Sequence, residues 1–199
     1  MKKSQTMAKA FELVAGHVAL DFVNTLDNRF LDWGPGELLG TYDDLLRFVV
    51  QSGLLTARQT KTLKGDREDA LAQAKELREA LARVAYQQVD GERLSAKPVE
   101  TLEKYFREAA KHRHLTAEGL RTVWRWRGIE KNAAAPVWLL AQAAEDFLVS
   151  GDGARLRCCA SDSCRWLFLD TSKNHTRRWC DMKVCGNRMK ARRFYAKAR

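Results

Sequence analysis

The chain has no long apolar segment, and we expect no secretion signal. A membrane-spanning helix needs about eighteen or more consecutive apolar residues, and no such run occurs among the 199 residues. The basic start is not followed by the apolar region of a signal peptide, because Glu12, His17 and Asp21 interrupt the apolar residues from 11 to 23. We therefore expect a cytoplasmic protein that has no membrane partner.

The signatures of the common enzyme classes are also missing. The chain contains no H-E-x-x-H, no G-x-S-x-G and no G-x-x-x-x-G-K-[ST] motif, which would indicate a catalytic zinc site, a serine nucleophile or a phosphate-binding loop. Gly34, Gly36 and Gly40 do not have the spacing of a dinucleotide-binding loop, and no strand is expected before them. These absences predict that the chain is not an enzyme.

Cysteine is absent from most of the chain, and all five cysteines lie near its C-terminus. Four of them form two pairs of equal C-x4-C spacing, Cys159 with Cys164 and Cys180 with Cys185, and fifteen residues separate the pairs. Four thiolates on two tight turns can surround one Zn²⁺ tetrahedrally, and such a closed shell is typical of a structural site. We predict one Zn²⁺ per chain on these four cysteines.

Other uses of these thiols stay open as alternatives. Disulfides would need an oxidising compartment, which the missing signal peptide argues against. An iron–sulfur cluster would use the same four ligands, but nothing else in the chain indicates redox chemistry. His175 could replace one thiolate, although four cysteines of matched spacing already complete the shell. Cys158 is left spare, because only Cys159 repeats the spacing of the second pair.

Acidic side chains are scarce at the same end of the chain. Residues 155–199 carry thirteen Lys and Arg against three Asp, which accounts for the whole net charge of +10. Subtracting these from the chain totals of 35 basic and 25 acidic residues leaves 22 of each sign in residues 1–154. All the excess positive charge therefore lies on the predicted metal module, which indicates a polyanion as its partner.

A basic helix is predicted from Gly186 to near the C-terminus. Ala191, Phe194 and Ala198 form an apolar stripe at helical spacing, which we expect to dock on the zinc module, while Asn187 caps the helix. Basic residues on both flanks would contact phosphates on either side of a DNA groove; a solvated basic end that binds nothing specific is the alternative. The residues predicted to contact double-stranded DNA are Arg177, Arg178, Lys183, Arg188, Lys190, Arg192, Arg193 and Lys197.

Residues 1–150 are predicted to form a helical body with one β-hairpin. The strongest helical pattern runs from Asp66 to Val89, and Thr41 with Asp44 forms a capping-box pattern that predicts another helix start. The hairpin is expected around a turn at residues 116–119, because the residues that follow alternate between apolar and polar. The fold class is therefore mainly α (α+β): a helical body with a hairpin, then a small zinc module and a basic C-terminal helix.

Two domains are expected, at residues 1–150 and 155–199, with Asp152 and Gly153 as a hinge between them. On this view, loss of the metal would unfold the module and leave the helical body folded. In the hairpin, Trp124 and Trp126 share one face of a strand, and core packing or cover of the hairpin is expected for them in preference to base stacking.

Four polar residues near the N-terminus, His17, Asp21, Asn24 and Thr25, share one face of a predicted short helix. Beside apolar neighbours, they could line a pocket for a small-molecule effector. The simpler interpretation is a hydrogen-bonded cluster that anchors this helix. A catalytic site at the same cluster is a more distant alternative.

The segment from Leu156 to Arg199 resembles the CGNR zinc-finger family. Besides the two C-x4-C pairs, the resemblance is carried by Trp166–Asp170, Arg177–Cys180 and Cys185–Arg188. Residues 16–25 resemble the N-terminal signature of the ABATE domain, which usually accompanies this zinc finger. The resemblance implies a bacterial stress-induced transcription regulator whose four paired cysteines hold the metal, and it identifies neither an operator nor an effector.

The first functional hypothesis is a zinc-dependent, DNA-binding transcription regulator of bacteria, whose helical body senses a ligand or mediates association. The second is a protein–protein interaction module, in which the zinc is structural and the basic surface meets an acidic partner without DNA specificity. A homodimer would suit a DNA regulator, although no heptad pattern in the sequence demands one.

Overall fold

The computed structural model describes residues 10–197, apart from the side chains of Arg193 and Lys197. It confirms a mainly α fold with some β structure, which includes three two-stranded antiparallel sheets. The elements in chain order are α1 (Val18–Val23), β1 (Leu26–Asp27), β2 (Gly36–Glu37), α2 (Tyr42–Gln51), α3 (Ala57–Thr60), α4 (Arg67–Asp90), α5 (Ala96–Lys111), β3 (Arg113–Glu118), β4 (Arg121–Trp126), α6 (Ala135–Val149), the 3-10 helix η1 (Asp152–Arg155), β5 (Leu156–Cys158), β6 (Leu167–Leu169), the π-helical turn η2 (Met182–Gly186) and α7 (Asn187–Lys197).

Local signals in the sequence set the ends of several helices. The hydroxyl of Thr41 accepts a hydrogen bond from the Asp44 amide at 3.2 Å, and the Asp44 carboxylate accepts one from the Thr41 amide at 2.8 Å. This reciprocal pair is the predicted capping box, and it satisfies two amides that the start of α2 would leave without partners. The long helix α4 ends at Gly91, whose φ of +68° is a conformation that glycine adopts without steric cost.

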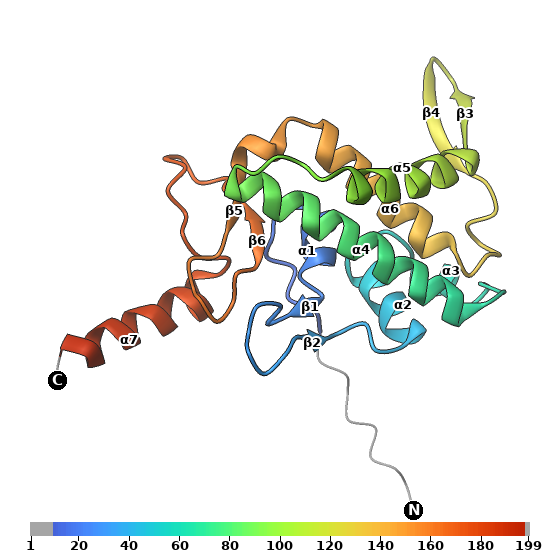
Figure 1. The fold of residues 1–199 in the computed structure, drawn as a ribbon. Coiled ribbons are helices and arrows are strands. Elements are labelled where there is room, and N and C mark those ends of the chain that lie inside the picture. The colour runs from blue at the N-terminus through green and yellow to red at the C-terminus, as the bar shows by residue number, and fades with distance from the viewer. Residues whose placement is uncertain (1–9, 198–199) are drawn as a thin grey trace, which may run out of the picture.

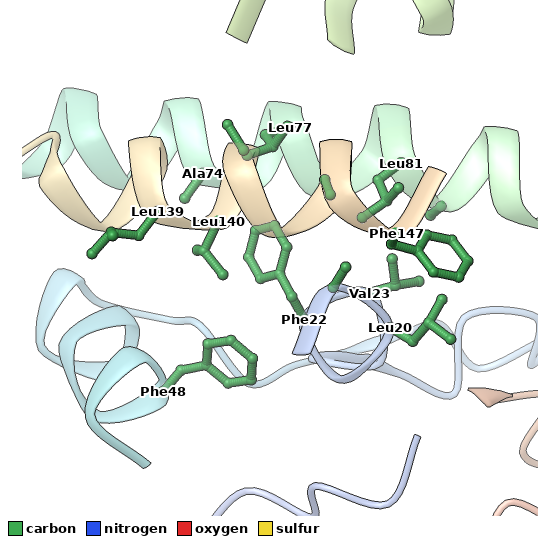
Figure 2. Close-up of a cluster of buried hydrophobic side chains, with 14 of the residues drawn as sticks. Leu20, Phe22, Val23, Phe48, Ala74, Leu77, Leu81, Leu139, Leu140 and Phe147 are labelled. Carbon is green, nitrogen blue, oxygen red and sulfur yellow. The ribbon is translucent and has the colours of Figure 1, made fainter. Parts of the chain in front are cut away.

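The core of the body lies where α1 crosses beneath α4 and α6 (Figure 2). Phe22 of α1 points toward Leu140 of α6, and Leu20 of α1 lies near Phe147 of α6. All four side chains are fully buried. Helix α6 is apolar on nearly all sides because α1, α4 and α5 all pack against it. Each fully buried Phe or Leu side chain contributes about 1.5–3 kcal/mol through removal of apolar surface from water.

Two short segments differ from the prediction. No strand was expected before Gly34, Gly36 and Gly40, but β1 lies there and pairs with β2. The predicted hairpin is present as β3 and β4, yet its turn lies at Gly119 and Leu120 rather than at residues 116–119. Gly119 has a φ of +60°, so a two-residue turn forms there without strain and both strands extend to six residues.

The zinc module shares the core of the helical body. Leu156 of β5 and the β6 residues Leu167, Phe168 and Leu169 are buried in the same apolar cluster as the body helices. Strand β5 packs against α4 and β6 against α1 (Figure 1). Asp152 and Gly153, which were expected to form a hinge, belong to the helix η1, and this helix packs against α6. The boundary in the sequence therefore does not divide the apolar core.

Asn24 forms the most specific link between body and module. Its side-chain amide donates to the carbonyl oxygen of Leu167 at 2.9 Å, and its side-chain oxygen accepts from the amide of the same residue at 3.0 Å. On the same strand, the Leu169 amide donates to the carbonyl of Ala15 at 2.8 Å. These bonds satisfy backbone groups of β6 that its pairing with β5 leaves free, and unpaired buried groups of this kind are costly.

Among the described residues, no helix is both long enough and apolar enough to cross a membrane.

Replacement of Asn24 by Ala is expected to destabilise the whole described chain. It leaves the amide and carbonyl of Leu167 buried without partners, which costs about 2–4 kcal/mol for two groups. Urea unfolding followed by far-UV circular dichroism measures the loss, and we expect one transition because module and body share a core. Asn174→Ala, at an exposed position, is the matched control. A loss below 0.5 kcal/mol in Asn24→Ala would contradict the role of this link.

Candidate metal centre and basic surface

Four cysteine thiols converge between β5 and η2. The sulfur atoms of Cys159, Cys164, Cys180 and Cys185 all lie within 4.8 Å of one another. The Sγ atoms of Cys164 and Cys180 are 3.5 Å apart, and those of Cys180 and Cys185 are 3.7 Å apart. Four Zn–S bonds of about 2.3 Å in a tetrahedron would place neighbouring sulfurs about 3.8 Å apart. The thiols therefore fit one tetrahedral Zn²⁺, as the spacing of the cysteines predicts.

Two tight turns bring each cysteine pair together. In the first, the amides of Cys164 and Arg165 both donate to the carbonyl of Ser161, at 2.8 and 3.1 Å. In the second, the Asp181 carboxylate accepts from the Val184 amide at 2.8 Å and starts η2. Gly186 ends η2 in a crowded place, where an added Cβ would lie 3.3 Å from the Trp179 ring and closer still to the Met182 sulfur. A larger residue there would require the Met182 side chain to move and the Trp179 ring to give way slightly.

The close approach of the thiols disfavours their joint ionisation. Hydrogen bonds donated by Cys164 and Cys180 lower the pKa of Cys159, while their bonds with Cys159 raise the pKa values of Cys164 and Cys180. Burial is the main reason that the pKa of Cys185 is raised. Neighbouring negative charges oppose one another in this way unless a cation balances them. A bound Zn²⁺ supplies that positive charge and keeps coordinating thiols deprotonated.

Cys158 and His175, the other residues considered as metal ligands, lie outside the cluster of four thiols. Cys158 donates to the carbonyl of Arg165 at 3.1 Å, and burial raises the pKa of its thiol. His175 lies next to the carbonyl of Asp170, with its Nδ1 3.3 Å from that oxygen. Among the described residues, the group suited to a metal consists of the four paired cysteines. The structure therefore gives neither residue a place in the shell.

Asp170 is a structural residue that the sequence analysis did not single out. Its carboxylate is fully buried and accepts from the Ser172 amide at 2.9 Å, the Ser172 hydroxyl at 2.5 Å and the Arg177 amide at 2.9 Å. These bonds, that from the Ser172 hydroxyl above all, lower its pKa. The signal available was the sequence Asp-Thr-Ser, because an Asp two residues before a Ser is typical of an Asx turn.

Helix α7 projects away from the module toward the C-terminus (Figure 1). Of the predicted DNA contacts, Arg178, Lys183, Arg188, Lys190 and Arg192 have exposed side chains. The side chains of Arg193 and Lys197, and the residues Ala198 and Arg199, lie outside the described part of the chain. Lys183 thus lies on η2, and Arg188, Lys190 and Arg192 lie on α7, whereas Arg178 precedes both elements.

The predicted docking of the α7 stripe is wrong. Phe194 is 69% exposed and Ala191 is also exposed, because α7 continues directly from η2 and projects away from the module (Figure 1). Asn187, which was predicted to cap the helix, is the first residue of α7. Its side-chain amide instead donates to the carbonyl of Lys183 at 3.0 Å.

Arg177 differs from the other predicted DNA contacts because its guanidinium points inward. Its Nε donates to the carbonyl of Trp179 at 2.9 Å, and its Nη2 donates to the carbonyl of Val14 at 3.1 Å and to that of Cys180. The guanidinium also lies over the Phe168 ring, 4.4 Å from its centroid. Arg177 therefore ties the second cysteine turn to the N-terminal segment, a role that its place in a basic run did not indicate.

The polar cluster of the first helix is engaged in internal contacts. Nδ1 of His17 accepts from the Ala19 amide at 3.2 Å, and the Thr25 hydroxyl donates to the Phe22 carbonyl at 2.6 Å. The carboxylate of Asp21 accepts from the Ala15 amide at 2.9 Å, while Asn24 holds β6 as described above. Two cavities, of about 580 and 710 Å³, are lined by other residues. The geometry supports the anchoring role, and ligand binding by these four residues stays a prediction.

Family models match both parts of the chain. The ABATE model, described as "Putative stress-induced transcription regulator", matches residues 16–151. The model of the CGNR zinc finger matches residues 155–198 and includes all four clustered cysteines. A search of the curated proteins found no match.

Replacement of Cys180 by Ser is expected to reduce the zinc content from about one ion per chain to well below one, because three thiolates bind the ion less tightly. Since the module shares the core of the body, we now expect the whole chain to melt at least about 10 °C lower, a loss of a few kcal/mol. Elemental analysis and thermal unfolding measure the two effects. Cys158→Ser, outside the cluster, should keep its zinc. Unchanged zinc in Cys180→Ser would refute the ligand assignment.

The stability of the chain is expected to depend on the ionisation of Asp21. Burial raises the pKa of its carboxyl from 3.8 to about 6, although hydrogen bonds from backbone amides oppose the rise. The folded state therefore favours the protonated carboxyl. Its contribution to the free energy of unfolding is complete below about pH 4 and is lost as the pH rises through about 6. Asp21→Asn should therefore gain about 1.5 kcal/mol relative to the natural chain between pH 5 and pH 7.5. Urea unfolding of both chains at each pH tests this, and a constant difference would contradict it.

Proposed function

Since the chain belongs to the ABATE family and carries a CGNR zinc finger, we propose that it is a zinc-dependent, DNA-binding transcription regulator. The observation that carries the proposal is α7, an exposed basic helix that projects from a base built by four cysteines. Double-stranded DNA is the proposed partner, because the whole excess charge of +10 lies in the segment that contains this helix.

The dimensions of α7 suit a DNA groove. Its 11 residues extend for about 16 Å at 1.5 Å per residue, and the major groove of B-DNA, about 12 Å wide, admits an α-helix. Arg188 and Arg192 are one helical turn apart on one flank, and Lys190 lies on another. Side chains on two flanks can reach phosphates on both sides of a groove. The arrangement therefore supports phosphate contacts better than it supports base-specific contacts.

The metal sets the direction of this helix. Cys185 lies within η2, directly before the first residues of α7. A bound Zn²⁺ would join Cys185 to three sulfurs that are held against the body, so the start of α7 cannot turn independently. Arg177 supports the same arrangement, because it binds carbonyls of both the second cysteine turn and the N-terminal segment. Loss of zinc should therefore abolish DNA binding by disordering the base of the helix.

The helical body is proposed as the sensing or association domain in a cytoplasmic bacterial regulator that has no catalytic activity. A small-molecule effector would act through the cavity of about 580 Å³, because residues of the body (Asp27) and of the module (Cys185 and Arg188) both line it. A homodimer is a further expectation. A protein-interaction module without DNA specificity is the competing function.

DNA binding by the zinc-loaded chain is expected to weaken steeply with salt. The logarithm of the affinity should fall with the logarithm of the salt concentration by about 0.9 per neutralised phosphate. Arg188→Ala, Lys190→Ala and Arg192→Ala should each lower the affinity several-fold and reduce this slope by about one. Fluorescence anisotropy with a labelled duplex, measured from 50 to 200 mM salt, checks both quantities.

The matched control is Lys61→Ala, which removes an exposed positive charge from the body and should change neither quantity. Absence of duplex binding by the zinc-loaded chain at 50 mM salt would refute the proposed function and favour the protein-interaction alternative. Selection of bound duplexes from a random pool, with and without a chelator, would then show whether any base preference depends on zinc.

A further inference from the structure

The hairpin of β3 and β4 projects from the body at the end opposite to α7 (Figure 1). Its root is held firmly: the His112 ring stacks on Trp138 with centroids 3.4 Å apart, and the Arg113 guanidinium donates to the side chain of Gln142. The Arg127 amide donates to the His112 carbonyl at 2.7 Å and closes the base of the hairpin. A firmly rooted projection presents its surface in a defined direction.

One face of this hairpin carries exposed apolar side chains. Leu115 and Trp124 are directly opposite each other across the strands, and they are 56% and 59% exposed. Leu120 at the tip is fully exposed. Trp126 packs against the core as expected. Trp124 does not reach the core: the Arg113 guanidinium lies 4.6 Å from its ring centroid, and the side chain stays exposed. An apolar cross-strand pair in water is a common sign of a surface that another molecule covers.

The strand edges of the hairpin are also open. In the described structure β3 and β4 pair only with each other, over six residues each. Each strand therefore presents a row of unpaired amide and carbonyl groups on its outer edge, which can accept a further strand. A two-stranded hairpin is marginally stable in water on its own, so an added strand would stabilise it.

The charge of the hairpin selects an acidic partner. Residues 112–127 contain four arginines and a single acid, Glu118. Glu118 pairs with Arg125, whereas Arg121 and Arg127 are exposed at the two ends of β4 and no ion pair involves them among the described residues. A second copy of the chain would bring the same arginines together, which disfavours self-pairing. A nucleic acid would gain nothing from Leu115 and Leu120, which neither bind phosphate nor stack on bases.

We propose that this hairpin is a docking site for a protein partner whose acidic, extended segment adds a strand to an open edge. Main-chain hydrogen bonds to β3 or β4 would supply affinity, as in other strand-addition complexes. Apolar side chains on one face of the added strand would cover Leu115 and Trp124. Carboxylates along it would pair with Arg121 and Arg127. The site lies at the far end of the molecule from α7, so this partner and DNA can bind together.

The test is a selection from a random library of twelve-residue peptides on the zinc-loaded full chain. The frequency of each selected peptide is compared with its frequency after the same selection on a Leu115→Thr/Trp124→Thr double variant. Threonine preserves the preference for strand structure in that variant. We expect enriched peptides that are acidic and alternate apolar with polar residues. A selected peptide should bind the double variant at least tenfold more weakly. The same peptide methylated on alternate backbone amides should lose binding, because it cannot donate to the strand edge.

The matched control is Trp33→Thr, which removes a tryptophan that is 78% exposed on the body and should leave peptide binding unchanged. Arg121→Gln/Arg127→Gln should weaken binding and reduce its dependence on salt. Circular dichroism confirms that each variant is folded before binding is measured. The proposal fails if no peptide is enriched over the double variant, if enriched peptides are basic, or if backbone methylation has no effect.

A labelled twenty-residue thymidine oligonucleotide is measured alongside the peptides. If it binds the natural chain and Trp124→Thr abolishes that binding, the hairpin is a nucleic-acid surface and the proposal is overturned. Failure of the hairpin proposal would leave the duplex affinity and salt slope of the α7 variants unchanged. The two proposals can therefore fail separately.

Discussion

The attachment of β6 to the first helix is the constraint on which the rest of this molecule depends. The Asn24 side chain binds both backbone groups of Leu167, and the Ala15 carbonyl binds the Leu169 amide two residues later. Between these bonds, Phe168 is fully buried with the helices of the body. An asparagine side chain thus takes the place of a neighbouring strand. Because β6 leads from the first cysteine turn toward the second, the metal centre is built directly on the core.

This attachment changes what the metal does for the protein. A small metal module on a flexible linker would fold and unfold by itself, with the metal as its main source of stability. Here the four sulfurs, the strands β5 and β6, and the helices α1 and α4 belong to one packed unit. Zinc bound to these sulfurs would therefore stabilise the helical body as well as the module. The same coupling would carry a change in the body, such as an effector in the cavity beside Cys185, to the base of α7.

The two projecting elements face opposite directions from a common body (Figure 1). Helix α7 presents the exposed side chains of Arg188, Lys190 and Arg192 on two flanks, as suits a phosphate backbone. The hairpin of β3 and β4 combines positive charge with exposed leucine and tryptophan, as suits an acidic protein segment. If α7 holds DNA, the rigid helices α4 and α6 would hold the hairpin away from it. This separation would let the chain contact DNA and an acidic protein partner at the same time.

Several features could be read from the sequence because they depend on residues close together in the chain. The capping box of Thr41 and Asp44, the helix α4 and the two cysteine pairs follow from spacing alone. Counting the charged residues along the sequence is enough to locate the excess positive charge. The tertiary structure decided which surfaces meet. Nothing local shows that Arg177 turns inward to bind carbonyls, or that Trp126 is covered while Trp124 is open. The stripe on α7 likewise has helical spacing, but whether anything covers it depends on where η2 directs the helix. Periodicity identifies an apolar face, and only the packing of distant segments determines what lies against it.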